Sequence, residues 1–348
     1  MKNRENEKIL APILFILMIM SLSSGCLTQK EESDIQQTES PPPSVEVYLL
    51  EWANLQNDQG PVYSQDWSPR EPLLAISGFS QVKLWRAEPT PTEQVLEGHT
   101  SYVWGVAFSP DGNTLATASR DGTVRLWKGP TFEESAVLET GFAFCVSWAP
   151  DSAMVAVGTL SGEIQAWDAG SEKLVHMWRS HSSSMIISIV WAPDGKTIVT
   201  GELEGGIYVW DAETFTLQKS MTDYSIERRD VNGLAFSPDG KTLASAHQDG
   251  KIRLWDTRDW NLLNTINAHY GWVRGVAWSP DGRMLASSGE DKRACLWDPE
   301  TGKRLIDKVH NFLPVWSVAW SEDGGYFSSG SGIYNDLKSG WVIVWKVQ

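Results

Sequence analysis

The sequence lacks the motifs by which most enzyme classes are identified. It contains no Gly-x-Ser-x-Gly elbow, no His-Glu-x-x-His pair, no Walker loop and no Cys-x-x-Cys. Gly330-Ser331-Gly332 has no third glycine for a dinucleotide fingerprint, and residues 335–340 carry too few carboxylates for a calcium loop. We therefore predict no catalytic residue, no metal and no cofactor, and we interpret residues 335–340 as a solvated hairpin within an insertion at 333–341.

Positive charge and long apolar runs are also scarce. The chain has 29 basic and 44 acidic residues, a formal net charge of −15. Such an acidic surface repels phosphate backbones, so we expect no nucleic-acid partner. The main apolar stretch, residues 9–20 (ILAPILFILMIM), is shorter than the roughly 20 residues that a membrane-spanning helix needs.

The sequence is rich in one repeated unit. Residues 107–127 (AFSPDGNTLATASRDGTVRLW) combine a Ser-Pro-Asp-Gly turn with two β-rich runs separated by Asp-Gly, the pattern of a small antiparallel meander. Counterparts of the turn begin every 40 to 45 residues, at Ser68, Ser109, Ala149, Ala192, Ser237, Ser279 and Ser321. Each follows a Trp or Phe, and the repeats end on Trp85, Trp127, Trp167, Trp210, Trp255, Trp297 and Trp345. A meander this small cannot bury both faces, so the copies must pack on one another.

This pattern resembles the WD-repeat β-propeller family in its period and in its Trp-Asp endings, which occur in four repeats. The resemblance runs from about residue 45 to the C-terminus. It implies an all-β fold, a seven-bladed β-propeller of four-stranded antiparallel blades. The last repeat stops directly after its third strand, so we predict that residues 45–55 (VEVYLLEWANL) supply its fourth strand and close the ring.

The family also has a buried tetrad of histidine, hydroxyl, aspartate and tryptophan that braces each blade. Two repeats match it fully: His99, Thr117, Asp121 and Trp127, and then His269, Ser287, Asp291 and Trp297. The fourth repeat has His181 but Glu204 for the aspartate, and the fifth has Glu227 where the histidine belongs. We interpret the histidines as packing residues rather than metal ligands or catalytic bases, because a repeated position in a repeated unit is usually structural.

Residues at the start of each inner strand line the narrower rim of the channel in this family, and partners commonly dock there. Counting back four and six positions from the aromatic residue before each turn gives a set that includes Tyr63, Tyr102, Trp104, Phe142, Phe144, Trp272, Arg274 and Trp316. Aromatic and arginine side chains are typical of interaction hot spots, so we predict a partner-binding rim. The alternative is that these rings only fill the gaps between wedge-shaped blades.

The first 26 residues resemble an export signal. Basic residues precede the apolar stretch and small residues follow it. Ser24-Gly25-Cys26 resembles the lipobox of prokaryotic lipoproteins, in which the cysteine receives a diacylglycerol and becomes the new N-terminus, although Ser23 replaces the commoner leucine. The alternatives are an uncleaved anchor or a plain signal with an accidental cysteine. The lipoprotein and plain-signal interpretations both place the propeller outside the cytoplasm.

Residues 28–44 (TQKEESDIQQTESPPPS) have Ile35 as their only large apolar side chain, so we expect a disordered tether that stiffens at its prolines. The predicted organisation is a signal peptide over 1–25, a lipidated tether over 26–44 and the propeller over 45–348. The other two cysteines, Cys145 and Cys295, belong to nonadjacent repeats, and we expect no disulfide between them.

Together these features predict a membrane-tethered binding platform in a prokaryotic envelope. The main hypothesis is a monomeric protein-interaction scaffold whose partners are other proteins and which touches the membrane through its lipid anchor alone. A capture module for a glycan or small ligand, stacking on the same rings, is the alternative, and a propeller enzyme is a distant third.

The anchor hypothesis predicts the behaviour of Cys26→Ser. This variant should lose lipid labelling and either release the propeller or leave an uncleaved precursor held by residues 9–22. Two acyl chains on one cysteine anchor a protein stably, since each buried CH₂ contributes about 0.8 kcal/mol. Metabolic labelling with a radioactive fatty acid and detergent partitioning would measure both effects. Labelling that persists in Cys26→Ser would rule out the lipoprotein assignment.

Overall fold

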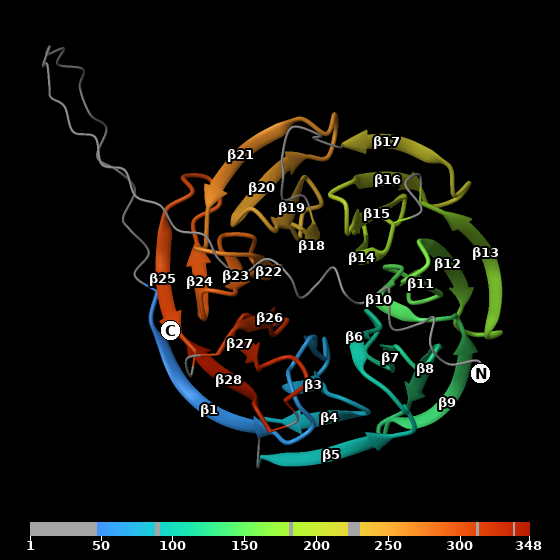
Figure 1. Ribbon diagram of the computed structural model, residues 1–348, viewed down its shortest axis with the longest axis horizontal. Helices are drawn as coiled ribbons and strands as arrows, with labels where there is room; N and C mark the ends of the chain where they lie inside the picture. The colour runs from blue at the N-terminus through green and yellow to red at the C-terminus, as the bar shows by residue number, and fades with distance from the viewer. Residues whose placement is uncertain (1–46, 88–90, 181–183, 222–229, 311–312, 337) are drawn as a thin grey trace, which may run out of the picture. The chain divides into compact units, whose positions relative to one another are not determined.

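The computed structural model describes residues 47–87, 91–180, 184–221, 230–310, 313–336 and 338–348. These residues form seven four-stranded antiparallel sheets, arranged as blades around a ring, and contain no helix (Figure 1). The predicted seven-bladed propeller is therefore confirmed. The predicted signal peptide, the tether and Cys26 lie outside the described residues.

The first four blades follow one another along the chain, each from the innermost strand outwards. Blade one contains β2 (Gln65–Trp67), β3 (Leu73–Ser77), β4 (Gln81–Arg86) and β5 (Thr92–Glu97). Blade two contains β6 (Val103–Phe108), β7 (Thr114–Ser119), β8 (Thr123–Lys128) and β9 (Glu133–Glu139). Blade three contains β10 (Ala143–Trp148), β11 (Met154–Thr159), β12 (Glu163–Asp168) and β13 (Lys173–Arg179). Blade four contains β14 (Ile186–Trp191), β15 (Thr197–Glu202), β16 (Ile207–Asp211) and β17 (Leu217–Met221).

The last three blades include the one that joins both ends of the described chain. Blade five contains β18 (Val231–Phe236), β19 (Thr242–His247), β20 (Lys251–Asp256) and β21 (Leu262–Asn267). Blade six contains β22 (Val273–Trp278), β23 (Leu285–Gly289), β24 (Arg293–Trp297) and β25 (Arg304–Val309). Blade seven contains β26 (Val315–Trp320), β27 (Tyr326–Ser331), β28 (Gly340–Val347) and, on its outer edge, β1 (Leu49–Asn57).

The pairing of β1 with β28 closes the ring. The two strands run antiparallel, with Leu49 opposite Val347 at one end and Asn57 opposite Gly340 at the other. The backbones of Tyr48 and Gln348 exchange two further hydrogen bonds of 3.0 and 3.1 Å. The predicted strand donation from the N-terminal side is confirmed, with the strand itself placed slightly later than residues 45–55.

Side chains reinforce the turn that ends each inner strand. In blade two Ser109 Oγ donates to Asp111 at 2.6 Å and accepts from the Thr114 amide at 2.9 Å. Gly112 takes a φ of 65°, a conformation that glycine adopts at little cost. The same serine and aspartate pairing recurs in three other blades, at Ser237, Ser279 and Ser321. The serine and aspartate pairing therefore fixes where the inner strand reverses in four of the seven blades.

The core lies between neighbouring blades. All residues of β7 are buried, because both faces of this second strand contact another blade. One apolar cluster joins Leu84 of blade one to Leu115 and Trp127 of blade two. The outermost strands are mostly exposed, as the pattern of β13 shows. Packing against both neighbours is what makes seven small meanders stable.

The two complete tetrads form continuous hydrogen-bond chains. His99 contacts Asp121 through Nδ1 and Thr117 through Nε2, both at 2.7 Å, and the Trp127 indole donates to the same Thr117 hydroxyl at 3.0 Å. In blade six, the chain of His269, Asp291, Ser287 and Trp297 has contacts of 2.7 to 2.8 Å. Burial alone would raise the pKa of Asp291, but the hydrogen bond and charge of His269 outweigh it and the pKa is lowered.

Other blades brace the closing tryptophan with different partners. In blade five the position of Glu227 lies outside the described residues, and His247 contacts Ser245 instead, at 2.8 Å from within the same strand. Burial lowers the pKa of His247 to about 3, so this imidazole is neutral. In blade three the Trp167 indole donates to Gln165 at 3.0 Å. The sequence did not indicate these substitutions, because the replacing residues stand outside the tetrad positions of the family.

The brace of blade six predicts a difference between two aspartate variants. Asp291→Ala removes the acceptor of His269 and of the Tyr270 amide, and an unsatisfied buried polar group costs about 1 to 3 kcal/mol. Asp151→Ala loses only an exposed turn contact to the Ala153 amide and should cost much less. Thermal or urea unfolding of both variants measures the difference. Equal losses of stability would contradict the bracing role.

A buried carboxyl group in blade one makes stability depend on pH. Asp66 accepts a hydrogen bond from the Phe108 amide of the next blade at 2.7 Å. Burial raises its pKa from 3.8 to about 7, against the lowering effect of the Phe108 and Trp67 amides. Because the folded pKa lies above the unfolded one, this contribution to stability is complete below about pH 4 and is lost as the pH rises through about 7.

Asp66→Asn keeps an acceptor oxygen but does not ionise. Its melting temperature should match that of the parent near pH 4 and exceed it by several degrees near pH 8, as calorimetry over roughly this range would show. A constant difference between the two proteins across this range would contradict the assignment.

Candidate functional site

The predicted rim residues share a backbone feature. The inner strands of blades two to seven each have a register shift that leaves one extra residue near the start of the strand. The six extra residues are Trp104, Phe144, Ile187, Asn232, Arg274 and Trp316. A β-bulge redirects its side chain relative to the ladder. The bulges therefore bring one side chain from each of these blades to the same end of the inner strands.

Five aromatic rings gather at this end of the channel, and we call them the mouth cluster: Tyr63, Tyr102, Trp104, Trp316 and Tyr334. The ring centroid of Tyr63 lies 4.3 Å from that of Trp104 and 5.3 Å from that of Trp316. Tyr334 stacks on Tyr102 at 5.9 Å and on Trp104 at 6.2 Å. Phe144 extends the cluster by stacking on Trp104 at 5.0 Å. The cluster thus joins blades seven, one, two and three.

The insertion between β27 and β28 takes part in this cluster. Tyr334 is half-buried against the rings of blades one and two, and the Tyr102 hydroxyl donates to Asn335. The Trp316 indole donates to the Gly332 carbonyl at 2.8 Å. The segment interpreted as solvated, residues 335–340, begins directly after Tyr334, and Tyr334 itself packs inwards because apolar ring surface is available beside it. An aromatic residue within a polar insertion was the signal in the sequence.

Arg274 lies between two indole rings. Its guanidinium carbon is 4.3 Å from the ring centroid of Trp272 and 4.2 Å from that of Trp316, and Nη2 donates to Glu290. Burial lowers the pKa of Arg274, and the nearby charge of Glu290 acts in the opposite direction. Burial also raises the pKa of Asp230 to about 6, against the attraction of Arg274. The arrangement holds a guanidinium rigidly at the mouth, where cation–π contacts are strengthened by partial desolvation.

Two buried polar atoms of the mouth have no hydrogen-bond partner among the described residues: the Tyr63 hydroxyl and Arg274 Nε. Burial raises the pKa of Tyr63 well above its ordinary value, so the hydroxyl stays protonated. An unmet buried donor costs about 1 to 3 kcal/mol, so such groups are uncommon in ordinary cores. At the mouth these two donors are available to a partner that offers an acceptor.

The rim is less exposed than the sequence suggested. Tyr63 and Tyr102 are each only 9% exposed, so the expectation that they stand in solvent is wrong. They are covered because neighbouring bulges and Tyr334 pack on them. Phe142 is 50% exposed, and the remaining predicted residues are half-buried: Trp104, Phe144, Trp272, Arg274 and Trp316. The alternative interpretation, in which the rings only fill gaps between blades, therefore applies to Tyr63 and Tyr102.

Sequence analysis missed three exposed apolar side chains on the same face. Tyr270, beside the tetrad histidine of blade six, is 96% exposed, and Leu160 and Ile333 are 43% and 48% exposed. The Leu160 amide donates to the Phe142 carbonyl, which places these two residues side by side in blade three. They were missed because they stand in loops outside the counted positions. With Phe142 they give this face four exposed apolar side chains.

Within the part of the chain that the structure describes, no group of three or more His, Cys, Asp or Glu side chains could hold a metal ion. In the same residues no helix is long and apolar enough to cross a membrane. Cys145 and Cys295 both carry free thiols. The chemistry that the mouth itself offers is recognition through rings, a guanidinium and two unmet donors.

Known proteins share parts of this chain. Over 93 residues it is 36% identical to WD repeat-containing protein 1 of Gallus gallus, covering 25% of this chain and 15% of that protein. It is 37% identical over 92 residues to a probable cytosolic iron-sulfur protein assembly protein, Ciao1, of Culex quinquefasciatus, covering 24% and 27%. It is 32% identical over 120 residues to coronin-7 of Mus musculus, covering 31% and 13%. The aligned segments therefore span about a quarter or less of these relatives.

A sequence model of the family described as WD domain, G-beta repeat matches this chain five times, at residues 91–128, 172–211, 218–256, 260–298 and 305–346. The matched residues make up more than half of the chain. Most of blade one and the inner strands of blade three fall outside them, and blade three is the one in which Gln165 braces the closing tryptophan. Propellers of this family are generally non-enzymatic scaffolds that bind other proteins. On this match and on the seven-bladed fold, the chain belongs to the WD domain, G-beta repeat family.

Proposed function

We propose that this protein is a binding platform for other proteins and that it binds them through the face at the mouth end of the channel, which we call the mouth face. This face carries the mouth cluster and the exposed aromatic side chains of Phe142 and Tyr270. The observation that carries the proposal is the set of four exposed apolar side chains on a face whose centre holds a desolvated arginine between indoles. Large apolar side chains exposed on one face are typical of interaction sites. Trp, Tyr and Arg are also the residues that most often dominate binding energy.

The geometry favours a protein partner over a glycan. A glycan stacks on open aromatic faces, whereas Tyr63, Trp104 and Tyr334 already pack on one another. The side chains that remain open belong to three blades, with Phe142 and Leu160 in blade three, Tyr270 in blade six and Ile333 in blade seven, which suits a broad partner surface. The rigid blades that carry these side chains limit the side-chain entropy lost on binding. A glycan or small ligand remains the second candidate, with the exposed ring of Tyr270 as its stacking surface.

We further propose that the platform is tethered to a membrane outside the cytoplasm. The support is the apolar stretch of residues 9–20 followed by Ser24-Gly25-Cys26, together with the polar composition of residues 28–44. Residues 28–44, polar and ending in prolines, suit a spacer that gives the mouth face access to partners while an acyl chain holds the protein. The Cys26→Ser experiment tests this proposal separately from the binding surface.

The binding proposal predicts the effect of Phe142→Ala combined with Tyr270→Ala. Both side chains are exposed, so the circular dichroism spectrum and melting temperature should stay unchanged while retention of partner proteins falls by about tenfold or more. Quantitative pull-down from envelope extracts, with a glycan array run in parallel, measures the effect. Trp104 and Trp316 are poorer choices because each packs on other rings.

A matched control is Val175→Ala combined with Leu263→Ala. These side chains are 52% and 57% exposed, but they lie on the outer strands β13 and β21. The control should retain every partner. Partners lost equally from both double variants would contradict the mouth face as the working surface, and selective loss of glycan signal would favour the second candidate.

A further inference from the structure

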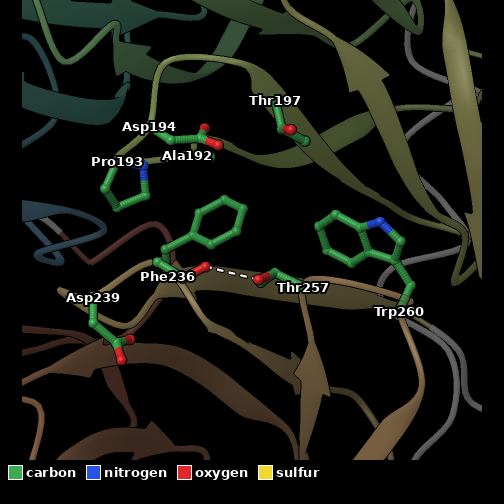
Figure 2. A pocket seen from close by; sticks show the side chains of 9 residues that line it. Ala192, Pro193, Asp194, Thr197, Phe236, Asp239, Thr257 and Trp260 are labelled. Carbon is green, nitrogen blue, oxygen red and sulfur yellow. Dashed lines mark hydrogen bonds between the residues drawn. The ribbon is translucent and has the colours of Figure 1, made fainter.

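A pocket of about 340 Å³ opens between blades four and five, at the opposite end of the inner strands from the mouth. Figure 2 shows its lining, which comes from the turn after β14, the turn after β18 and the loop after β20. The residues are Ala192, Pro193, Asp194, Thr197, Phe236, Asp239, Gly240, Thr257 and Trp260. Its size falls within the range of small-ligand sites.

The pocket exists because of a local departure from the repeat. Five of the seven repeats place a tryptophan before the turn, whereas blades two and five have Phe108 and Phe236. In blade two the space left by the smaller ring is filled by Phe132, which is 4% exposed and has its centroid 5.6 Å from that of Phe108. Trp260 has the corresponding position in blade five and packs, with Phe236 and Trp255, against one apolar cluster, but it is only partly buried. Part of the space beside Phe236 therefore stays open.

Trp260 is held in a conformation that favours glycine. Its φ is 63°, and the equivalent position of blade six is occupied by Gly302 with a φ of 69°. A left-handed conformation costs a non-glycine residue about 1 to 2 kcal/mol. The aromatic residues at the equivalent positions of other blades use their rings for internal packing, as Phe132 does on Phe108 and Phe215 does on His176 at 4.8 Å. The indole of Trp260 packs against an apolar cluster as well, but it also lines the pocket (Figure 2).

The charge of the lining is negative. Asp194 and Asp239 stand in the turns on the two sides of the pocket, and no lysine or arginine lines it. The Asp194 carboxylate is directed into the pocket, whereas the Asp239 carboxylate is directed away from the rings of Phe236 and Trp260 (Figure 2). The Ser237 hydroxyl hydrogen-bonds Asp239 and lowers its pKa, so this carboxylate is ionised at neutral pH. Lys241 pairs with Asp239 at 3.1 Å, but its side chain is 76% exposed and the pair is screened by solvent. The Thr257 hydroxyl already donates to the Gly240 carbonyl at 2.8 Å (Figure 2).

We propose that this pocket binds an alkylammonium group, with its cationic head between Asp194 and the face of Trp260 and its alkyl part against Phe236 and Pro193. An indole face attracts a cation through its quadrupole, the Asp194 carboxylate adds charge complementarity, and Asp239 adds to the negative charge of the lining. The group can come from a small quaternary amine or from a lysine side chain of a peptide. This inference does not depend on the function of the mouth face.

The test follows the indole N–H resonance of Trp260 by two-dimensional NMR during titrations of the full protein. Choline and N-acetyl-lysine methylamide are the cationic probes, and 3,3-dimethyl-1-butanol is the neutral isostere of choline. We expect a saturable shift with at least one cationic probe, about tenfold tighter than with the neutral alcohol and weaker at high salt. The better of the two cationic probes identifies the source of the ammonium group.

Variants separate the pocket from general surface charge. Phe236→Trp introduces the residue that five other repeats carry, so it should keep the fold, fill the pocket and abolish binding of the cationic probes. Asp194→Asn with Asp239→Asn should weaken binding about tenfold, whereas Asp281→Asn, in the matching turn of blade six, should leave it unchanged. No saturable shift with either cation, equal binding of the neutral alcohol, or full binding by Phe236→Trp would each overturn the proposal.

Discussion

The hydrogen-bonded pairing of β1 with β28 is the interaction on which the rest of this structure depends. Each blade buries its second and third strands only because another blade covers each face, so an open row of repeats would leave two faces exposed. Closure also brings blade one against blade seven, where Gln65 donates to the carbonyls of Ser317 and Ser328, both at 3.1 Å. The mouth cluster spans this same junction, since Tyr63 precedes the first inner strand and Trp316 lies in the last.

Within the closed ring, the repeats tolerate chemical variation where geometry is preserved. The closing tryptophan needs one acceptor for its indole N–H, and a threonine, a serine or Gln165 supplies it in different blades. His247 reaches the serine of blade five from the same strand, because residues two positions apart share a face. The brace is therefore a physical requirement that several residue combinations meet, which explains why the blade remains regular where the family motif is incomplete.

The two ends of the channel differ because the repeat is broken in different places. At the mouth, bulged residues and the insertion bring rings together and surround Arg274 with indoles. At the opposite end the Ser-Pro turns are nearly uniform, and one smaller ring, Phe236, leaves a pocket between two blades. In both cases the uniform repeats supply a rigid frame, and the exceptions to the repeat provide the surfaces with chemical character.

The sequence by itself determined the seven repeats and their turn positions, because Pro, Gly and Trp recur at fixed offsets within a nearly fixed period. Its resemblance to the WD-repeat family implied the ring of blades, its closing strand and the two complete tetrads. It also located most rings of the mouth. Only the tertiary structure decided which of them are exposed. Tyr63 and Tyr102 are covered by residues from blades distant in sequence, and Tyr334 joins them from an insertion without a repeat counterpart. The pocket beside Phe236 likewise depends on how far Trp260 packs inwards. The solvent exposure of a side chain is set by the neighbouring blades that cover it and cannot be derived from the local sequence pattern.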